Sequence, residues 1–406
     1  MVFKFLSLYN ECITQRTRKE RFSMNLTDTD KAFFDEALKK AMDKISHVAD
    51  RSRGIIPYST VNFRFDDKSS PDSINWWTNG FYGGILWLMY HETHEDKYKE
   101  AALEIGDKLS VCFDRFYNLD HDCGFLWLPT DVAAYKETGF SDGRKRGLHA
   151  ANIMAGRFNP TGSYIRAWND GIGKENGPTS NVGWCIIDCL MNLPLLYWAS
   201  EETHDPRFKH VAMRHADMAI KNFLREDGSV NHIVELNPET GEFVQSFGGQ
   251  GYAHGSSWTR GQGWAIYGFF LSYLHTGEER YLEASKKVAH YFIENIPESG
   301  LIPVDFKQPK EPSYEDSTAA AIASCGLIEL SKVTSGSEGK LFLSSALKLL
   351  RALTEKRCDF TLNQDNIVNY CTASYHNKNH HIAIIYGDYY YLEALLKLHG
   401  DELFIW

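Results

Sequence analysis

The chain alternates between two kinds of helical segment. One kind is apolar almost throughout and rich in Gly, Ala and Trp, and the next is amphipathic, with charged residues on one face. In both kinds the apolar positions recur with the period of an α-helix. This period predicts helices over residues 30–48, 79–92, 96–113, 181–200, 206–224, 259–275, 279–295, 317–333, 339–355 and 387–398, with a short strand within 229–237.

The turns between paired helices resemble one another. HETHEDKY (91–98), EETHDPRF (201–208), HTGEERY (275–281) and, more loosely, VTSGSEGKLF (333–342) bring an acidic residue close to the start of the second helix, where the helix dipole favours negative charge. Repeated hairpins of this kind predict an all-α (α/α)6 barrel, with the apolar helices inside and the amphipathic helices outside. A superhelical solenoid is the structural alternative.

The chain contains no low-complexity linker, so residues 25–406 are expected to form a single barrel domain. Residues 1–24 are expected to be an N-terminal extension that need not be ordered, and Met24 is an alternative start. The extension fits neither a signal peptide nor a membrane span. The eight cysteines form no C-x-x-C pair. Free buried thiols suit a reducing compartment, which favours the cytoplasm, with the periplasm as the alternative.

Composition excludes several classes of function. The net charge is −10, and no basic patch is interleaved with aromatic residues, which argues against nucleic-acid binding. The motifs HExxH, GxSxG, GxGxxG and the P-loop are absent from the sequence, so metalloprotease, serine-hydrolase and nucleotide-dependent functions lack support. The ten tryptophans fit a sugar-binding site, because a flat indole ring matches the C–H face of a pyranose.

Two carboxylates stand in apolar surroundings. Asp188 lies within NVGWCIIDCLMNLPLLYWA (181–199), and Asp122 lies within NLDHDCGFLW (118–127). Burial and a like-charged neighbour raise the pKa of a carboxyl group, which makes it a usable acid near neutral pH. Such pairs carry out acid–base chemistry on glycosides. The alternatives are a turn residue for Asp122 and a satisfied core carboxylate for Asp188.

A third group lies in GQGYAHGSSWTRGQGWAIYG (249–268). Gln250 and Arg260 offer forked donors suited to carboxylate and hydroxyl groups, and Trp264 offers a flat apolar face. The alternative is a glycine-rich loop in which a serine caps the next helix.

Seven segments in chain order carry a family resemblance. They are WWTNGFYGGILWLMY (76–90), HDCGFLW (121–127), AGRFNPTGSYIRAWNDG (155–171), NVGWCIIDCLMNLPLLYWAS (181–200), QGYAHGSSWTRGQGWAIYG (250–268), YEDSTAAAIAS (314–324) and YGDYYYLEALLK (386–397). Together they resemble the unsaturated glucuronyl hydrolases of glycoside hydrolase family 88. The resemblance implies an (α/α)6 barrel with no metal or nucleotide cofactor. It also implies a substrate, an oligosaccharide that a polysaccharide lyase has left with a Δ4,5-unsaturated uronic acid at its non-reducing end.

The resemblance also implies a reaction and a site. One Asp protonates C4, water adds at C5, and the resulting hemiketal opens to release the remaining sugar. By position, Asp188 matches the general acid/base and Asp122 matches a helper carboxylate. The matched substrate-binding positions are Trp76, Trp168, His232, Gln250, Arg260, Trp264 and Tyr375, and Ser374 and Lys378 partly match a cluster that contacts sulfate or the leaving sugar. Gly249, His254 and Gly255 depart from the family pattern, which leaves the substrate preference open.

Three other functions remain alternatives. An unsaturated rhamnogalacturonyl hydrolase would apply the same chemistry to pectin fragments. A sugar epimerase on the same barrel needs paired histidine bases, which His232 and His254 do not supply at equivalent positions. A non-catalytic sugar-binding barrel would not need both Asp122 and Asp188. Neither the parent polysaccharide nor the oligomeric state follows from the sequence.

Overall fold

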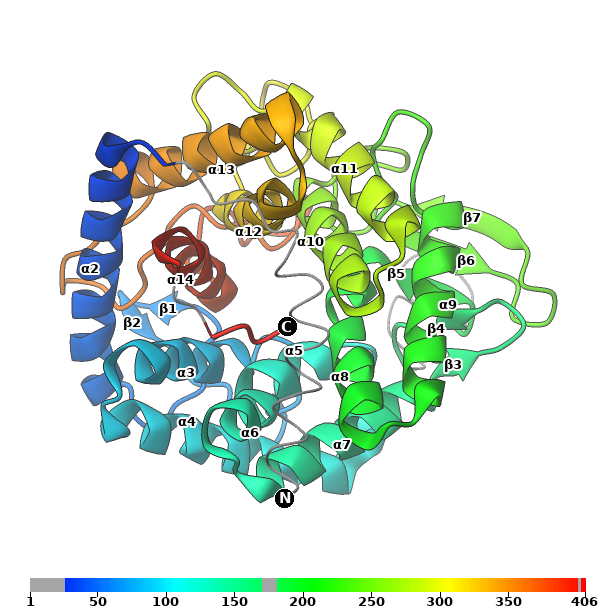
Figure 1. The fold of residues 1–406 in the computed structure, drawn as a ribbon, viewed down its shortest axis with the longest axis horizontal. Coiled ribbons are helices and arrows are strands. Elements are labelled where there is room, and N and C mark those ends of the chain that lie inside the picture. Colours follow the sequence, from blue (N-terminus) through cyan, green and yellow to red (C-terminus); the bar gives the residue numbers. More distant parts are fainter. Residues whose placement is uncertain (1–25, 170–180, 401–402) are drawn as a thin grey trace.

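The computed structural model describes residues 26–169, 181–400 and 403–406. Within these ranges the helices form two concentric rings (Figure 1). The outer ring contains α2 (Asp28–Arg51), α4 (Asp96–Leu109), α7 (Ser141–Ala155), α9 (Pro206–Asn222), α11 (Glu279–Glu294) and α13 (Gly336–Lys356). The inner ring contains α3 (Phe81–Thr93), α5 (Cys123–Trp127), α6 (Ala133–Thr138), α8 (Leu193–Thr203), α10 (Thr259–Thr276), α12 (Ser317–Val333) and α14 (Ile385–His399).

The ring closes where the last helix meets the first ones. The inner helix α14 packs against both α2 and α3, so neither end of the helix series is left open. The predicted (α/α)6 barrel is therefore confirmed, and a solenoid, whose ends stay apart, is excluded. The predicted N-terminal extension, residues 1–24, lies outside the described residues.

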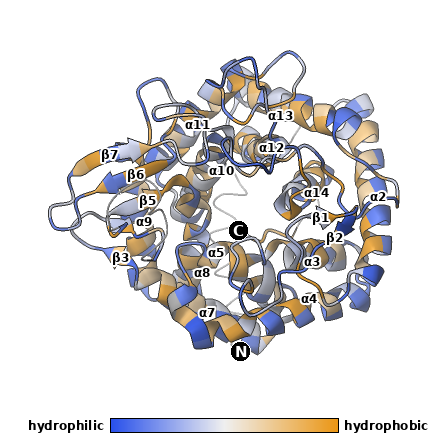
Figure 2. Ribbon diagram, turned by 180° about the vertical axis from the view of Figure 1, so that it is seen from behind, coloured by the Kyte–Doolittle hydropathy of each residue, from blue (hydrophilic) through white to orange (hydrophobic). Residues whose placement is uncertain are grey.

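Burial follows the difference between the two kinds of helix. The inner helix α12 is buried from Ser317 to Lys332, on all of its faces, as expected for a helix that is apolar all round. The outer helices α2 and α11 bury only one face, and hydrophilic and hydrophobic positions alternate along α2 in Figure 2. The apolar and amphipathic segments of the sequence thus become the inner and outer rings.

The similar turns share a backbone conformation. His94, His204 and Gly277 each follow an inner helix as its C-cap, and each adopts left-handed backbone angles. This conformation ends a helix and redirects the chain toward the next one.

One predicted helix is wrong over its first half. Residues 181–200 do not form a continuous helix: β5 (Trp184–Ile186) comes first, the 3-10 helix η4 (Ile187–Met191) follows, and α8 begins only at Leu193. An apolar run does not by itself distinguish a buried strand from a buried helix. Here β5 pairs with β6 (Ile233–Leu236), and Pro194 in the first turn of α8 marks the start of the true helix.

The helices α5, α6 and α7 were not predicted. A π-helical turn, η2 (Leu128–Val132), separates α5 from α6, and Gly139 ends α6 in a left-handed conformation. These breaks leave α5 and α6 too short for a clear helical period, whereas α7 is long enough but begins with the polar run SDGRKR. The stretch after α4 continues as the 3-10 helix η1 (Ser110–Asn118).

The strands are short and lie between the helices. They are β1 (Thr60–Val61) with β2 (Arg64–Phe65), β3 (Phe158–Asn159) with β4 (Tyr164–Ile165), and the three-stranded sheet β5–β6–β7 that ends with β7 (Phe243–Phe247). The strand predicted within 229–237 is confirmed as β6. In the described part of the chain, no helix combines the length and apolar character needed to cross a bilayer.

Candidate active site

The fold brings Asp122 and Asp188 together. Asp122 directly precedes α5, and Asp188 lies in η4. The side-chain amide nitrogen of Asn192 lies 3.2 Å from Asp122 Oδ1 and 3.3 Å from the Asp188 carbonyl oxygen. Asn192 thus links the carboxylate of Asp122 to the backbone of Asp188.

Burial governs the acidity of this pair. It raises the pKa of Asp188 to about 7, against the opposing effect of the Arg260 charge. It also raises the pKa of Asp122 well above its ordinary value, and the charges of Asp120 and Asp188 add to this effect. Two like-charged carboxyl groups in one buried site do not readily ionise together. The site can therefore hold an acidic proton at neutral pH.

Both carboxyl groups remain within reach of a ligand. The side chain of Asp188 is 16% exposed and that of Asp122 is 10% exposed. Oδ1 of Asp188 accepts no hydrogen bond from any residue that the structure describes. A buried oxygen without a partner is costly when the group is charged, which favours the neutral form of Asp188.

His232 faces Asp188 as a neutral imidazole. Its Nε2 lies 4.0 Å from Asp188 Oδ1, and burial lowers the pKa of His232 to about 3. The backbone N–H of Gln250 points at Nδ1 from 3.0 Å, and the Gly248 carbonyl lies 3.1 Å from the same nitrogen. These two contacts place opposite demands on Nδ1, because the Gln250 N–H needs a lone pair there and the Gly248 carbonyl needs a proton, so they do not fix the tautomer of His232.

Gly249 makes this arrangement of His232 sterically feasible. It adopts a left-handed φ of +55°, and a Cβ atom at this position would lie 2.1 Å from His232 Nδ1. A larger residue would displace the imidazole. The small residue that departs from the family pattern thus has a local structural reason.

Arg260 joins four segments of the site. Its guanidinium is 1% exposed and pairs with the Asp316 carboxylate at 2.5 Å. It also donates to the carbonyl oxygens of Thr372 and Ala373 at 2.8 and 2.7 Å, to Gln250 Oε1 at 3.0 Å and to Thr318 Oγ1 at 3.4 Å. Protein acceptors thus occupy much of the guanidinium, so its direct contact with sugar stays a prediction.

The predicted aromatic walls differ in accessibility. Trp76 is 45% exposed, and Trp168 is half-buried beside Trp184. Trp264 is fully buried in α10, between the rings of Phe125 and Tyr390. An inner helix that is buried all round leaves this indole no open face, so the structure does not support a direct sugar contact for Trp264.

The loop that follows Thr372 and Ala373 carries the remaining predicted site residues, which are Ser374, Tyr375 and Lys378. Tyr375 is 7% exposed, and its backbone N–H donates to the Gln250 carbonyl at 2.9 Å. Ser374 is half-buried and Lys378 is exposed. The loop thus places Tyr375 beside Gln250, whereas the contacts predicted for Ser374 and Lys378 stay predictions.

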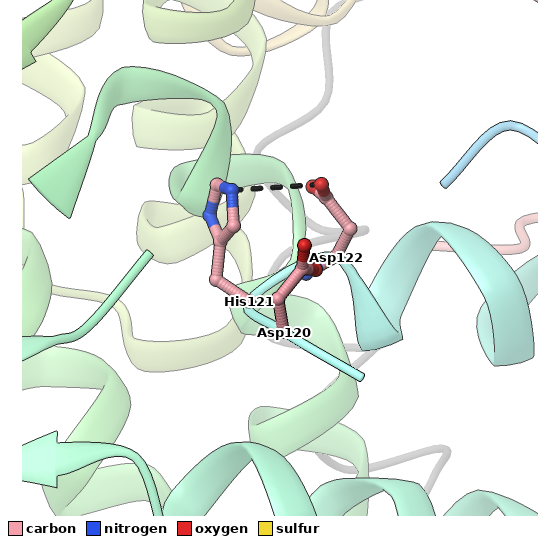
Figure 3. A group of neighbouring side chains, drawn as sticks. All are labelled: Asp120, His121 and Asp122. Carbon is pink, nitrogen blue, oxygen red and sulfur yellow. Dashed lines mark hydrogen bonds and ion pairs between the residues drawn. The ribbon is translucent and has the colours of Figure 1, made fainter. Parts of the chain in front are cut away.

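Three residues at this site were not predicted from the sequence: Asp120, His121 and Asn192. Figure 3 shows Asp120, His121 and Asp122 together. Asp120 accepts the backbone N–H of Asp122 at 2.9 Å, and His121 Nε2 lies 3.5 Å from Asp122 Oδ2. The signal that could have revealed the first two is the polar run DHD at the end of a loop. Asn192 gave no signal, because an isolated Asn in an apolar run commonly serves as a cap.

Asp120, His121 and Asp122 are the one group of potential metal ligands among the described residues. Their donor atoms lie within 4.8 Å of one another. One oxygen of Asp120 is occupied by the N–H of Asp122, and one oxygen of Asp122 by the amide of Asn192. The group is therefore already part of a protein hydrogen-bond network.

Comparisons with known proteins agree with this geometry. The family model described as Glycosyl Hydrolase Family 88 matches residues 48–406. The chain is 36% identical over 377 residues to the unsaturated glucuronyl hydrolase of Bacillus sp. (strain GL1), covering 91% of this chain and 94% of that protein.

Two solved structures are similar along the chain. A crystal structure of the unsaturated glucuronyl hydrolase of Bacillus sp. GL1, described as responsible for the degradation of glycosaminoglycan, superposes with a TM-score of 0.83 at 33% identity, covering 90% of this chain and 97% of that one. A mutant unsaturated glucuronyl hydrolase of Streptococcus agalactiae in complex with dGlcA-GalNAc6S gives 0.77 at 30% identity, covering 95% of each chain.

Proposed function

The chain belongs to Glycosyl Hydrolase Family 88, and we propose that it removes a Δ4,5-unsaturated uronic acid from the non-reducing end of lyase-generated oligosaccharides. The observation that carries the proposal is the buried, partly accessible carboxyl pair, in which the pKa of Asp188 is raised to about 7. Carbon is a poor proton acceptor. Protonating it at neutral pH therefore needs an acid whose pKa lies close to the working pH.

The reaction begins with addition of water across the C4=C5 bond. Neutral Asp188 gives its proton to C4, the oxygen of a water molecule bonds to C5, and the water's proton returns to Asp188. The C5 hemiketal then opens by breaking its bond to the ring oxygen. The C1 hemiacetal exposed in this way releases the remaining sugar as an alcohol. One water molecule is consumed, and the carboxyl group ends in its starting state.

Asp122 assists as an ionised helper. Its negative charge disfavours ionisation of its neighbour and so helps Asp188 keep its proton. Its free oxygen can accept a hydrogen bond from a ring hydroxyl group. His232 lies on the other side of Asp188 Oδ1, with its Nε2 4.0 Å away.

The remaining predicted residues would bind the sugar. We assign this role to Trp76, Trp168, Gln250 and Tyr375, supported by the position of Gln250 and Tyr375 beside His232 and Arg260. Arg260 contributes a positive charge close to Asp188 and holds the surrounding loops. The proposed steps draw only on protein groups and water, with no metal or nucleotide cofactor.

Glycosaminoglycan disaccharides are the substrates that we favour. The Streptococcus agalactiae relative holds dGlcA-GalNAc6S, and Ser374 and Lys378 lie on the loop next to Tyr375, where they could contact a sulfate or the leaving sugar. Pectin fragments remain the alternative, because the same carboxyl pair would serve both.

The test follows the ultraviolet absorbance of the conjugated C=C–carboxylate during incubation with unsaturated disaccharides. The panel contains products from chondroitin, hyaluronan, heparin, ulvan, gellan and pectin. Loss of absorbance that depends on Asp188 supports the proposal, and the fastest substrate identifies the source. Binding of these sugars without any loss of absorbance would instead identify a sugar-binding barrel.

The cysteines support a cytoplasmic enzyme. In the part of the chain that the structure describes, all seven cysteines are free, and six of them are buried. Thiols kept reduced are typical of the cytoplasm. Activity in a cytosolic fraction and its absence from the medium and periplasm would test this assignment.

A further inference from the structure

Asn192 occupies a central position between the two carboxylates. It is the residue between η4 and α8, and it is 0% exposed. Its side-chain oxygen accepts the backbone N–H of Phe125 at 2.8 Å, and its amide nitrogen donates to Asp122 Oδ1. The same nitrogen lies 3.3 Å from the Asp188 carbonyl. One buried side chain therefore touches the start of α5, the helper carboxylate and the backbone of the acid.

The orientation of this amide is fixed by its surroundings. The backbone N–H of Phe125 can only donate, so the atom that faces it must be the amide oxygen of Asn192. The NH2 group must then point toward Asp122. An N–H that donates to a carboxyl oxygen favours its ionised form.

Gly124 lets Asn192 come this close to α5. A Cβ atom at position 124 would lie 2.6 Å from the Asn192 Cα and 2.7 Å from its Oδ1. The Gly in HDCGFLW is thus explained by the approach of Asn192, an observation independent of the hydrogen bonds.

Resting on the proposed function, we propose that Asn192 is a positioning residue that holds Asp122 in place beside Asp188 and favours the ionised form of Asp122, so that Asp188 is the better placed of the two to carry the proton. Asp188 Oδ1, in contrast, receives no such donor from the described residues. The amide of Asn192 thus favours Asp122 as the helper and Asp188 as the acid.

The other groups that face the pair do not replace this amide. Burial raises the pKa of Asp122 most, the charges of Asp120 and Asp188 raise it further, and Arg157 lowers it without a hydrogen bond to the carboxylate. His121 lies beside Oδ2 but stays neutral, because burial lowers its pKa well below the usual value. Asn192 makes the hydrogen bond that favours the charged form of Asp122.

The test compares two substitutions by their pH–rate profiles. Asn192→Asp keeps an acceptor for the Phe125 N–H but removes the donor to Asp122, and Asn192→Ala removes both. We expect kcat at the wild-type optimum to fall about 30-fold, with KM changed by less than about threefold. We also expect the acid limb, set by ionisation of Asp122, to move up by about one pH unit, further for Asp than for Ala.

Two further variants separate positioning from general damage. Gly124→Ala pushes on Asn192 without touching either carboxylate, and it should shift the acid limb in the same direction. Asn366→Asp is the matched control: Asn366 is also buried, 2% exposed, and its amide donates to the Val368 carbonyl and to Asn369. It should leave the profile unchanged. Folded Asn192 variants with a wild-type acid limb would overturn the proposal, even if kcat falls.

A measurement without turnover keeps this proposal separate from the proposed function. In protein labelled with ¹³C at the aspartate carboxyl carbons, the Asp122 resonance is assigned by its loss in Asp122→Asn and titrated in wild type and Asn192→Ala. An upward shift of the Asp122 titration in Asn192→Ala supports the role of Asn192 even if the disaccharide panel gives no turnover. An unshifted titration overturns it even if the enzyme is active.

Discussion

Asp188 and Asp388 are two buried carboxyl groups with the same acidity in different surroundings. Burial raises the pKa of each to about 7. Asp388, on α14, accepts the backbone N–H groups of Ile367 and Val368 at 2.7–3.0 Å. Oδ1 of Asp188 accepts no hydrogen bond from the described residues and faces His232. A raised pKa alone therefore does not identify a catalytic acid. Access to the carboxyl group separates the two, since the Asp188 side chain is 16% exposed and Asp388 is 3% exposed.

The largest expected effect distinguishes Asp188 from Asp388 by enzyme activity. Asp188→Asn should lower kcat by about 1000-fold, because the acid is lost, while substrate binding and thermal stability stay near the wild type. Asp388→Asn keeps an oxygen for both N–H groups, so its activity should stay within about threefold of the wild type. The absorbance assay and thermal unfolding measure both. Equal losses in the two variants would contradict the distinction.

The second effect concerns Asp122, the carboxyl neighbour that Asp188 has and Asp388 lacks. Asp122→Asn should lower kcat by about 100-fold, because the charge that helps to keep Asp188 protonated is gone. The acid limb of the pH–rate profile should flatten as well, since the group that must ionise is absent. A pH–rate series at saturating substrate provides the measurement. A variant whose acid limb matches that of the wild type would argue against coupling of the two carboxyl groups.

The third effect is on stability. The folded-state pKa of Asp388 lies above its usual value of 3.8, so the folded protein holds a proton that the unfolded chain has released. Asp388 therefore lowers stability as pH rises from about 4 to about 7, by at most about 1.4 kcal/mol per pH unit. Asp388→Asn should flatten this dependence. Urea unfolding at about pH 5 and about pH 8 measures it, and an unchanged slope would show that Asp388 stays ionised.

The smallest expected effect tests His232, which faces Asp188. Gly249→Ala should displace His232, because the new Cβ would meet its Nδ1 at 2.1 Å. We expect kcat/KM to fall about 10-fold with the protein still folded. The Gly277→Ala variant serves as the control, since Gly277 shares a positive φ but has open space around it. If both variants lose activity equally, backbone strain rather than His232 is the cause.

The sequence predicted most helices of the two rings, but it missed α5, α6 and α7 and misassigned the first half of the segment 181–200. The helix predicted over 317–333 coincides with α12, because its apolar character continues on every face between clear turns. The segment 181–200 failed because strand pairing with β6, a contact between distant residues, decides its first half. Such a contact leaves no local periodicity.

Some residues of the candidate site could likewise be predicted from the sequence, and others could not. Asp122 and Asp188 could be predicted because a carboxylate in an apolar run is unusual wherever the chain folds. Asn192 could not, because its importance depends on the Phe125 N–H that lies opposite in the fold. Trp264 was predicted to contact the sugar from its residue type alone. Only the packing of α10 shows that neighbouring rings cover it.

The closing contact of α14 with α2 and α3 also sets an order of assembly. Synthesis produces α2 early and α14 late, so this seam joins segments that leave the ribosome far apart in time. Asp122, Asp188 and Asn192 belong to the first half of the chain, whereas the partners of Arg260 at Thr372 and Ala373 arrive near its end. We therefore expect the acid pair to form on an open half-ring, and the loops around it to lock only when the seam closes. Contacts of this range slow folding, and the half-ring is the stage at which a nascent chain most needs a chaperone.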